Sequence, residues 1–182
     1  MMMKSKKQIR KEIKIIIKNN KKEFVINGLS DFIKGKNIGV YLDINNEISM
    51  DNVINNIQNQ FNLFVPYMKD DGSNNILNAL LEFRKYDINK LCFDDFNIRS
   101  SNGEIIDIND LDMIIVPGLS FNTLGYRMGY GKGCYDKALK YFNKTIIGIC
   151  YDNCFIDELF HEEHDIRVNY VFTEKRYIKI RG

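Results

Sequence analysis

The sequence predicts an α/β protein in which helices cover both faces of a mostly parallel sheet. Its 182 residues are about the length of one domain, and no linker or internal repeat divides them. Short apolar runs typical of buried strands alternate along the chain with segments of helical periodicity. Hydrophobic residues make up 45% of the chain and charged residues 27%, which is ordinary for a globular protein and excludes intrinsic disorder. We therefore expect a single three-layer domain over residues 1–182.

The first predicted element is an amphipathic helix over residues 5–18 that packs on the rest of the domain. Ser5 is of the residue type that caps helix N-termini. The apolar stripe of this helix consists of Ile9, Ile13 and Ile16. The lysines expected to face solvent are Lys7, Lys11, Lys14 and Lys18. Lys6 and Arg10 lie four residues apart at the edge of the apolar stripe, so we expect them to point along the protein surface toward a site.

The remaining elements alternate between strands and helices. The predicted helices span residues 23–33, 48–61 and 134–142. The predicted strands span residues 37–42, 62–65, 111–116, 145–150, 168–172 and 177–180. Pro66 is expected to end the second of these strands, and residues 76–99 are interpreted as a strand pair with an irregular linker. In such sheets ligands bind beyond the carboxyl ends of the strands, so the loops at that edge are where we expect the site.

Charge is distributed unevenly along the chain. The net charge is only +2, but residues 1–22 carry nine basic side chains and one acidic side chain, which makes this segment +8. A basic arm of this kind allows a nucleic-acid-binding module as one alternative function. No aromatic residue interrupts residues 1–22, which argues against a single-stranded nucleic-acid surface.

Membrane and disulfide-stabilised classes are excluded by composition. No apolar run reaches the roughly 18–20 residues of a spanning helix, and the run 15–17 is too short for a signal peptide. The four cysteines form no CxxC pair, so we interpret them as reduced thiols of a cytoplasmic protein.

The most informative stretch is the glycine-rich block from Val116 to Asp136, where a predicted strand leads into a helix. The block reads VPGLSFNTLGYRMGYGKGCYD. Glycines at 129, 131 and 133 let backbone N–H groups approach a ligand closely, and such groups before a helix N-terminus form an anion site. Arg127 and Lys132 add positive charge, and a carboxylate at Asp136 suits a metal. The alternative is a glycine-rich turn without a ligand, which the flanking charged residues disfavour.

This block resembles the signature of the 5-formyltetrahydrofolate cyclo-ligase family, also called methenyltetrahydrofolate synthetases. The family pattern is approximately PGLxF followed by GxRLGxGxGYYD, and weaker similarities extend over nearly the whole chain. The resemblance implies a Rossmann-like α/β fold. It implies conversion of 5-formyltetrahydrofolate to 5,10-methenyltetrahydrofolate with ATP and Mg²⁺, by phosphorylation of the formyl oxygen and ring closure through N10. It further implies small-molecule substrates, no nucleic-acid or membrane partner, and a monomer or weak dimer.

The resemblance also implies roles for individual residues. ATP would be bound by Lys6, Arg10, Arg127, Met128, Gly129, Tyr130, Gly131, Lys132, Gly133, Cys134 and Tyr135. Of these, Arg127 and Lys132 would be catalytic. The folate substrate would contact Leu42, Glu47, Phe96, Tyr130, Gly131, Lys132, Gly133 and Cys134. The Mg²⁺ site would include Asp136 and Asp165. Cys134 stands where the family usually has an aromatic residue, and another nucleotide- or phosphosugar-binding α/β enzyme stays an alternative.

Overall fold

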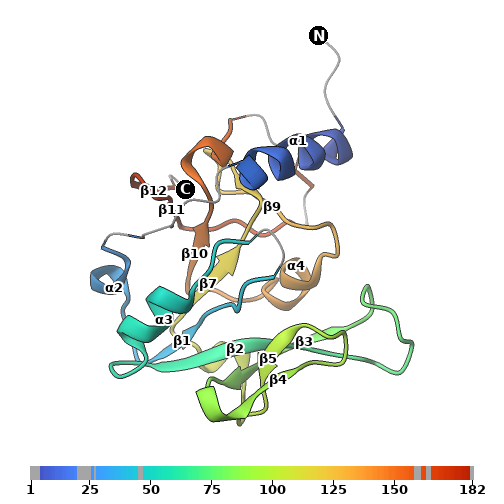
Figure 1. Ribbon diagram of the computed structural model, residues 1–182, viewed down its shortest axis with the longest axis vertical. Helices are drawn as coiled ribbons and strands as arrows, with labels where there is room; N and C mark the ends of the chain where they lie inside the picture. The colour runs from blue at the N-terminus through green and yellow to red at the C-terminus, as the bar shows by residue number, and fades with distance from the viewer. Residues whose placement is uncertain are drawn as a thin grey trace.

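The structure is a computed structural model that describes residues 5–19, 26, 28–44, 47–157, 161–162 and 165–180 (Figure 1). Its helices are α1 (Lys6–Asn19), α2 (Leu29–Phe32), α3 (Asp51–Ile57) and α4 (Cys134–Ala138), with short 3₁₀ turns η1 (Ile88–Lys90), η2 (Ile108–Asp110) and η3 (Asp152–Cys154). None of these helices has the length and apolar character of a membrane span.

An eight-stranded sheet forms the centre of the described fold. In spatial order it contains β12 (Tyr177–Lys179), β11 (Tyr170–Phe172), β10 (Thr145–Ile149), β7 (Met113–Pro117), β1 (Asn37–Gly39), β2 (Asn62–Lys69), β3 (Leu80–Lys85) and β6 (Ile105–Ile106). The five strands from β11 to β2 are parallel to their neighbours, whereas β12, β3 and β6 are antiparallel. Two small sheets pair β4 (Leu91–Phe93) with β5 (Arg99–Ser101) and β8 (Ser120–Phe121) with β9 (Arg127–Met128). The predicted fold class is therefore confirmed.

Helices cover both faces of the sheet. Successive side chains of a strand point to opposite faces, so the buried strands present apolar residues on both faces for helices to pack against. In β7, Ile114 and Val116 join the core cluster that also contains Ile13 and Ile17 of α1. Met113 and Ile115 of the same strand join a second cluster. That second cluster includes Leu29 of α2 and Ile54 and Ile57 of α3. Figure 1 shows the central strands between α3 on one side and α4 on the other.

The first helix forms much as its sequence predicts. Gln8 N donates to Ser5 Oγ at 3.3 Å, and Ser5 N donates to Gln8 Oε1 at 2.9 Å, so the two residues form a capping box. Ile13 and Ile17 are buried, and Ile9 and Ile16 pack partly buried beside them. This buried stripe holds α1 against the domain and leaves its basic residues at the margin of the contact.

Several predicted elements are shorter in the structure. The strand predicted for residues 37–42 ends at Gly39, and residues 40–44 belong to no helix or strand. The helix predicted for residues 48–61 spans only Asp51–Ile57, and the Ile48 carbonyl before it accepts a hydrogen bond from the Tyr41 hydroxyl at 2.8 Å. The helix predicted for 134–142 ends at Ala138. In the predicted helix 23–33 the structure describes α2, while residues 20–25 and 27 lie outside the described residues.

The prediction that Pro66 ends its strand was wrong, because β2 continues to Lys69. The Phe64 carbonyl accepts a hydrogen bond from Val40 N, so the backbone groups of Phe64 face β1. Alternate residues of a strand bond to the same neighbour, so the backbone groups of residue 66 face the β1 side as well. The register of β1 with β2 ends at the pair of Gly39 and Phe64, so Pro66, which has no N–H group, stands beyond the last paired residue. The Pro66 carbonyl instead accepts from Ser100 Oγ at 2.7 Å, and the pairing with β3 on the other side is intact.

Candidate active site

A cavity of about 460 Å³ opens at the carboxyl ends of the central strands. Leu42 follows β1, Met68 lies in the last part of β2, and Pro117 ends β7, and all three line the cavity. This is the edge at which open α/β sheets bind their ligands. The cavity is also lined by every residue from Arg127 to Asp136, which is the glycine-rich loop leading into α4.

The glycine-rich loop is built between two arginines. Gly131 has a φ of 88°, a left-handed conformation, and a Cβ placed there would lie 3.1 Å from Arg10 Cζ. A Cβ placed on Gly129 would lie 2.7 Å from Arg127 Nη1. The two glycines therefore allow guanidinium groups to pack directly against the loop backbone. This is a reason for glycine in addition to the ligand access that the sequence suggested.

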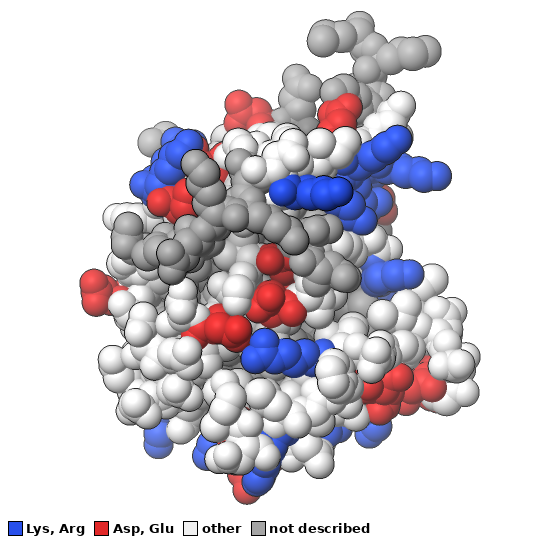
Figure 2. All heavy atoms as spheres, viewed as in Figure 1, with Lys and Arg blue, Asp and Glu red and all other residues white. Residues whose placement is uncertain are grey.

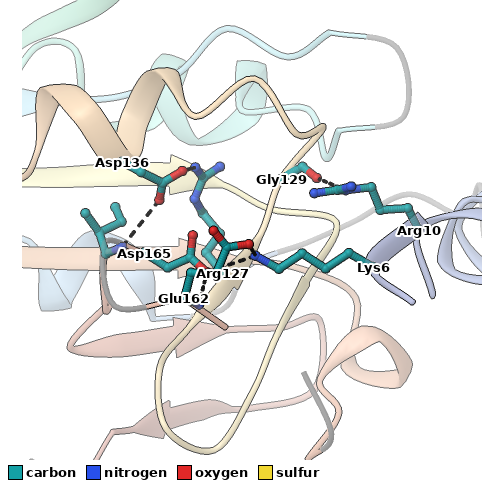
Figure 3. Close-up of polar contacts among 8 residues, drawn as sticks. Lys6, Arg10, Arg127, Gly129, Asp136, Glu162 and Asp165 are labelled. Atoms are coloured by element: carbon teal, nitrogen blue, oxygen red, sulfur yellow. Dashed lines mark hydrogen bonds and ion pairs between the residues drawn. The ribbon is translucent and has the colours of Figure 1, made fainter. Parts of the chain in front are cut away.

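Two basic side chains of α1 reach this cavity, as the helix geometry predicts (Figure 3). Arg10 Nε donates to the Gly129 carbonyl at 3.0 Å. Lys6 Nζ donates to Glu162 Oε1 at 2.9 Å and to Asp165 Oδ2 at 3.2 Å. Burial lowers the pKa of Lys6, but these bonds to two carboxylates outweigh it and raise that pKa. The N-terminal helix is thus joined to both sides of the site.

The other lysines of α1 are exposed, as predicted, but Lys14 is not directed only at solvent. Its ammonium lies 5.1 Å from the centre of the Tyr130 ring, which belongs to the glycine-rich loop. Lys14 follows Arg10 by four residues, and this spacing continues the row that Lys6 and Arg10 begin. Figure 2 shows basic side chains gathered over α1.

Arg127 and Asp136 form an ion pair at the base of the loop (Figure 3). Arg127 Nη2 lies 3.1 Å from Asp136 Oδ2, and the two side chains are only 7% and 14% exposed. Arg127 Nη1 also donates to the Pro117 carbonyl at 3.3 Å. Asp136 Oδ1 accepts from Ile166 N at 3.4 Å. The pair therefore connects the end of β7, the start of α4 and the segment near residue 166.

Carboxylates suited to a divalent cation lie in the same cavity. Asp136, Asp165 and Glu162 all line it, and the sequence reasoning missed Glu162. Among the described residues, no group of three or more His, Cys, Asp or Glu side chains is arranged to hold a metal ion. Magnesium commonly takes only one or two carboxylates and completes its shell with phosphate oxygens and water. The carboxylates of Asp136 and Asp165 fit that donor set. Their assignment to Mg²⁺ stays a prediction.

Glu47 contributes a largely buried carboxyl group to a part of the cavity that is otherwise apolar. Its Oε2 accepts a hydrogen bond from Ile44 N at 3.0 Å. Burial raises the pKa of Glu47 to about 7, although the Ile44 N–H and the nearby Arg127 charge act in the opposite direction. Leu42 and the buried Tyr41 line the cavity beside it. This part of the site can accept hydrogen bonds from the edge of a polar aromatic ligand.

Phe96 is not among the described residues that line the cavity, and its predicted folate contact has no support from its position. Asp94 and Ile98 of the same segment do line it. Asp94 Oδ1 accepts from Phe96 N at 3.0 Å and from Ile98 N at 2.8 Å, and Asn97 adopts a left-handed φ of 60°. This tight turn brings a buried carboxylate to the cavity in place of the aromatic ring. The Asp94–Asn97 pair, both common in turns, was the available sequence signal.

Apolar residues of β2, β3, the loop between them and the turn before β5 complete the cavity and were not predicted. They are Met68, Ile76, Leu81 and Ile98. Nothing in their local pattern separates them from core residues, because apolar side chains line cavities and cores alike.

Comparison with known proteins decides the family. Residues 2–174 match the 5-formyltetrahydrofolate cyclo-ligase family, which is nearly the whole chain. This chain belongs to the 5-formyltetrahydrofolate cyclo-ligase family. The family predicted from the glycine-rich block is thereby confirmed.

Individual cyclo-ligases align with parts of the chain. The 5-formyltetrahydrofolate cyclo-ligase of Mycoplasma genitalium is 30% identical over 125 residues, which is 64% of this chain and 60% of that protein. The cyclo-ligase of Mycolicibacterium smegmatis is 37% identical over 73 residues, which is 39% of this chain and 38% of that protein. These two alignments span less than two thirds of either relative.

Solved structures of this family cover the chain more fully. The 5,10-methenyltetrahydrofolate synthetase of Aquifex aeolicus superposes with a TM-score of 0.77 at 26% identity and covers 97% of this chain and 93% of its own. The corresponding protein of Mycoplasma pneumoniae gives a TM-score of 0.72 at 21% identity, with 94% and 99% coverage. The second likeness supports the fold alone, and both agree with the sheet described above.

Proposed function

We propose that this protein converts 5-formyltetrahydrofolate to 5,10-methenyltetrahydrofolate, and that ATP is cleaved to ADP and phosphate in the reaction. The observation that carries the proposal is the composition of the cavity. A glycine-rich loop packed between Arg10 and Arg127 shares it with Glu47 and an apolar wall. The loop suits a triphosphate, and the carboxylate with its apolar surroundings suits a pterin.

The proposed chemistry begins at the formyl group. A formamide oxygen is a poor leaving group, so the γ-phosphoryl group of ATP is transferred to it, which leaves a phosphorylated iminium and ADP. The folate N10 then attacks the activated carbon, its proton is lost, and phosphate departs as the five-membered ring closes. Phosphoryl transfer asks the protein mainly for positioning and for stabilisation of negative charge.

The cationic residues around the loop supply that stabilisation. Backbone N–H groups of residues 129–133 and the side chains of Lys6 and Arg10 would bind the phosphates of ATP, with Met128, Cys134 and Tyr135 beside the nucleotide. Arg127 and Lys132 would offset the charge on the phosphoryl group during transfer. Asp136 and Asp165 would hold Mg²⁺, which would neutralise phosphate charge when bound. Asp165 would then exchange its contact with Lys6 for the metal.

The folate ring would bind on the Glu47 side of the same cavity. An ionised Glu47 accepts paired N–H groups from the aminopyrimidinone edge of the pterin in a charge-assisted contact. Leu42 supplies an apolar surface, and residues 130–134 lie between the two substrates. The predicted folate contact of Phe96 stays a prediction, and Phe96 does not line the cavity.

The test is a direct assay of the purified protein. With 5-formyltetrahydrofolate, ATP and Mg²⁺ together, the absorbance of the methenyl product should rise, and ADP and product should form in equal amounts. Omission of any one component should abolish the signal. ATP cleavage without any folate requirement would instead favour the nucleotide- or phosphosugar-binding alternative, and no turnover at high enzyme concentration would overturn the proposal.

Arg10→Ala is expected to weaken the use of ATP. It removes a guanidinium that lines the cavity and the bond from Arg10 Nε to the Gly129 carbonyl. A charge-assisted hydrogen bond contributes about 1.5–3 kcal/mol, so kcat/KM for ATP should fall roughly 10- to 150-fold. Lys11→Ala, one residue along the same helix and exposed, is the matched control and should change kcat/KM less than twofold. Equal values for Arg10→Ala and the control would contradict the assignment.

Binding of 5-formyltetrahydrofolate is expected to depend on pH through Glu47. With the pKa of Glu47 at about 7, the carboxylate is mostly protonated at pH 6 and mostly ionised at pH 8. If the ionised form accepts the pterin N–H groups, affinity should rise about tenfold across that interval. Glu47→Gln should bind more weakly at pH 8 and show a flat profile. Titration calorimetry at pH 6, 7 and 8 measures both, and an equal slope in the variant would refute the role.

The raised pKa of Glu47 also predicts how the stability of the free protein depends on pH, and the direction is opposite to that of folate affinity. The pKa of Glu47 is raised on folding from 4.5 to about 7, so the folded state holds a proton that the unfolded chain has already lost. Stability should therefore fall as pH rises from 4.5 to 7. The melting temperature of wild type minus that of Glu47→Gln should therefore decrease between pH 4.5 and pH 7.

A further inference from the structure

The tip of the hairpin between β2 and β3, residues 70–79, is shaped mainly by its own hydrogen bonds. Asn74 N donates to Asp70 Oδ1 at 3.0 Å, and Leu77 N donates to Asn75 Oδ1 at 3.0 Å. Asn78 N donates to the Asn75 carbonyl at 2.8 Å. The side chains of residues 71–75 are exposed. Such bonds give the tip a local shape, but they do not determine how it lies over the body of the protein.

The side chain of Ile76, in the tip, turns toward the cavity. Ile76 is partly buried and lines the cavity. There it joins Met68, Leu81 and Ile98 from β2, β3 and the turn before β5. These four residues form the apolar wall of the cavity. Ile76 is the member of that wall that the hairpin tip contributes.

Lys137 connects this tip to α4, the helix that the glycine-rich loop leads into. It lies in α4, next to Asp136, and its Nζ donates a hydrogen bond to the Leu77 carbonyl. Leu77 directly follows Ile76, and its carbonyl belongs to the Leu77–Asn78 peptide unit, so the bond holds the chain one residue beyond the inward-turned side chain. Helix α4 also packs against β3, the strand that the tip leads into. Figure 1 shows α4 beside this hairpin.

We propose that Lys137 is a positioning residue, which holds Ile76 over the cavity and so completes the apolar wall that the folate substrate contacts. The inference rests on the proposed function for the identity of that substrate. Lys137 does not line the cavity, so it acts through Leu77 and Ile76 rather than on the substrate. Because its ammonium is exposed and the bond is single, we expect the effect to be moderate, about threefold to tenfold.

The first experiment uses the free protein and needs no substrate. In Lys137→Met, which keeps the aliphatic stem, hydrogen exchange at the amides of Asn74, Leu77, Asn78 and Ala79 should be threefold to tenfold faster than in wild type. Lys137→Arg should restore slow exchange because it keeps a cationic donor. Lys140→Met, an exposed lysine two residues beyond the end of α4, is the matched control and should exchange as wild type. Unchanged exchange in Lys137→Met would overturn the proposed contact.

The second experiment measures ligand affinity. Lys137→Met should bind 5-formyltetrahydrofolate threefold to tenfold more weakly, with the dissociation constant for Mg-ATP unchanged within twofold. Ile76→Ala should weaken the same folate binding, and the double variant Lys137→Met/Ile76→Ala should be no weaker than Ile76→Ala alone. Additive losses, or equal losses for both ligands, would overturn the positioning role. If wild type binds no folate while the exchange result holds, the proposed function fails and the Lys137 contact stands.

Discussion

Gly131→Val should nearly abolish ATP-dependent turnover while leaving the protein folded. The φ of 88° at Gly131 is one that a β-branched residue rarely adopts. The added Cβ would also lie 3.1–3.3 Å from the three terminal atoms of the Arg10 guanidinium. The loop or Arg10 must move, and either movement displaces a group that we place on the triphosphate. We expect kcat/KM for ATP to fall about a hundredfold or more, since each preorganised donor lost costs about 10²–10³.

Gly28→Val is the matched control for this prediction. Gly28 also has a left-handed φ, of 76°, but a Cβ there meets no atom within 4 Å, and Gly28 does not line the cavity. Both variants carry backbone strain of about 1–3 kcal/mol, and only Gly131→Val meets the arginine. The control should therefore lose much less activity. Urea unfolding of both variants checks that the loss is not global, and equal losses would show that strain alone explains them.

Arg127→Met is expected to have the largest effect on stability. It removes the cation from Asp136, a carboxylate whose side chain is only 14% exposed. Loss of one partner of a buried pair costs about 3–5 kcal/mol, because the remaining charge stays buried without compensation. For a chain of this length, that corresponds to a melting temperature lower by about 6–20 °C. Turnover should also fall at least about a hundredfold if Arg127 stabilises the transferred phosphoryl group.

The double variant Arg127→Met/Asp136→Asn separates the two roles of the pair. A neutral amide in place of the carboxylate removes the uncompensated charge, so most of the stability should return while turnover stays low. Calorimetry of wild type, the single variant and the double variant measures this. A double variant that stays as unstable as Arg127→Met would show that the arginine stabilises the fold through its packing and its bond to the Pro117 carbonyl.

Much of the fold could be predicted because strands and helices depend on neighbouring residues. The apolar run 111–116 predicted β7, whose residues are buried on both faces of the sheet. The spacing of Lys6 and Arg10 correctly directed both side chains toward the site. Element ends were harder to predict, since they depend on contacts outside the element. Pro66 is an example, because it is tolerated in β2 only where β1 has already ended.

The sequence by itself determined the alternation of strands and helices, the glycine-rich loop and the family to which this chain belongs. Each of these depends on residues that lie close together in the chain. The tertiary structure decided which distant side chains meet in the cavity. It placed Asp94 there instead of Phe96, brought Lys6 to Asp165 across a separation of 159 residues, and added Ile76 from a hairpin tip. Such contacts depend on turn geometry and on the packing of whole elements against one another, which local periodicity does not encode.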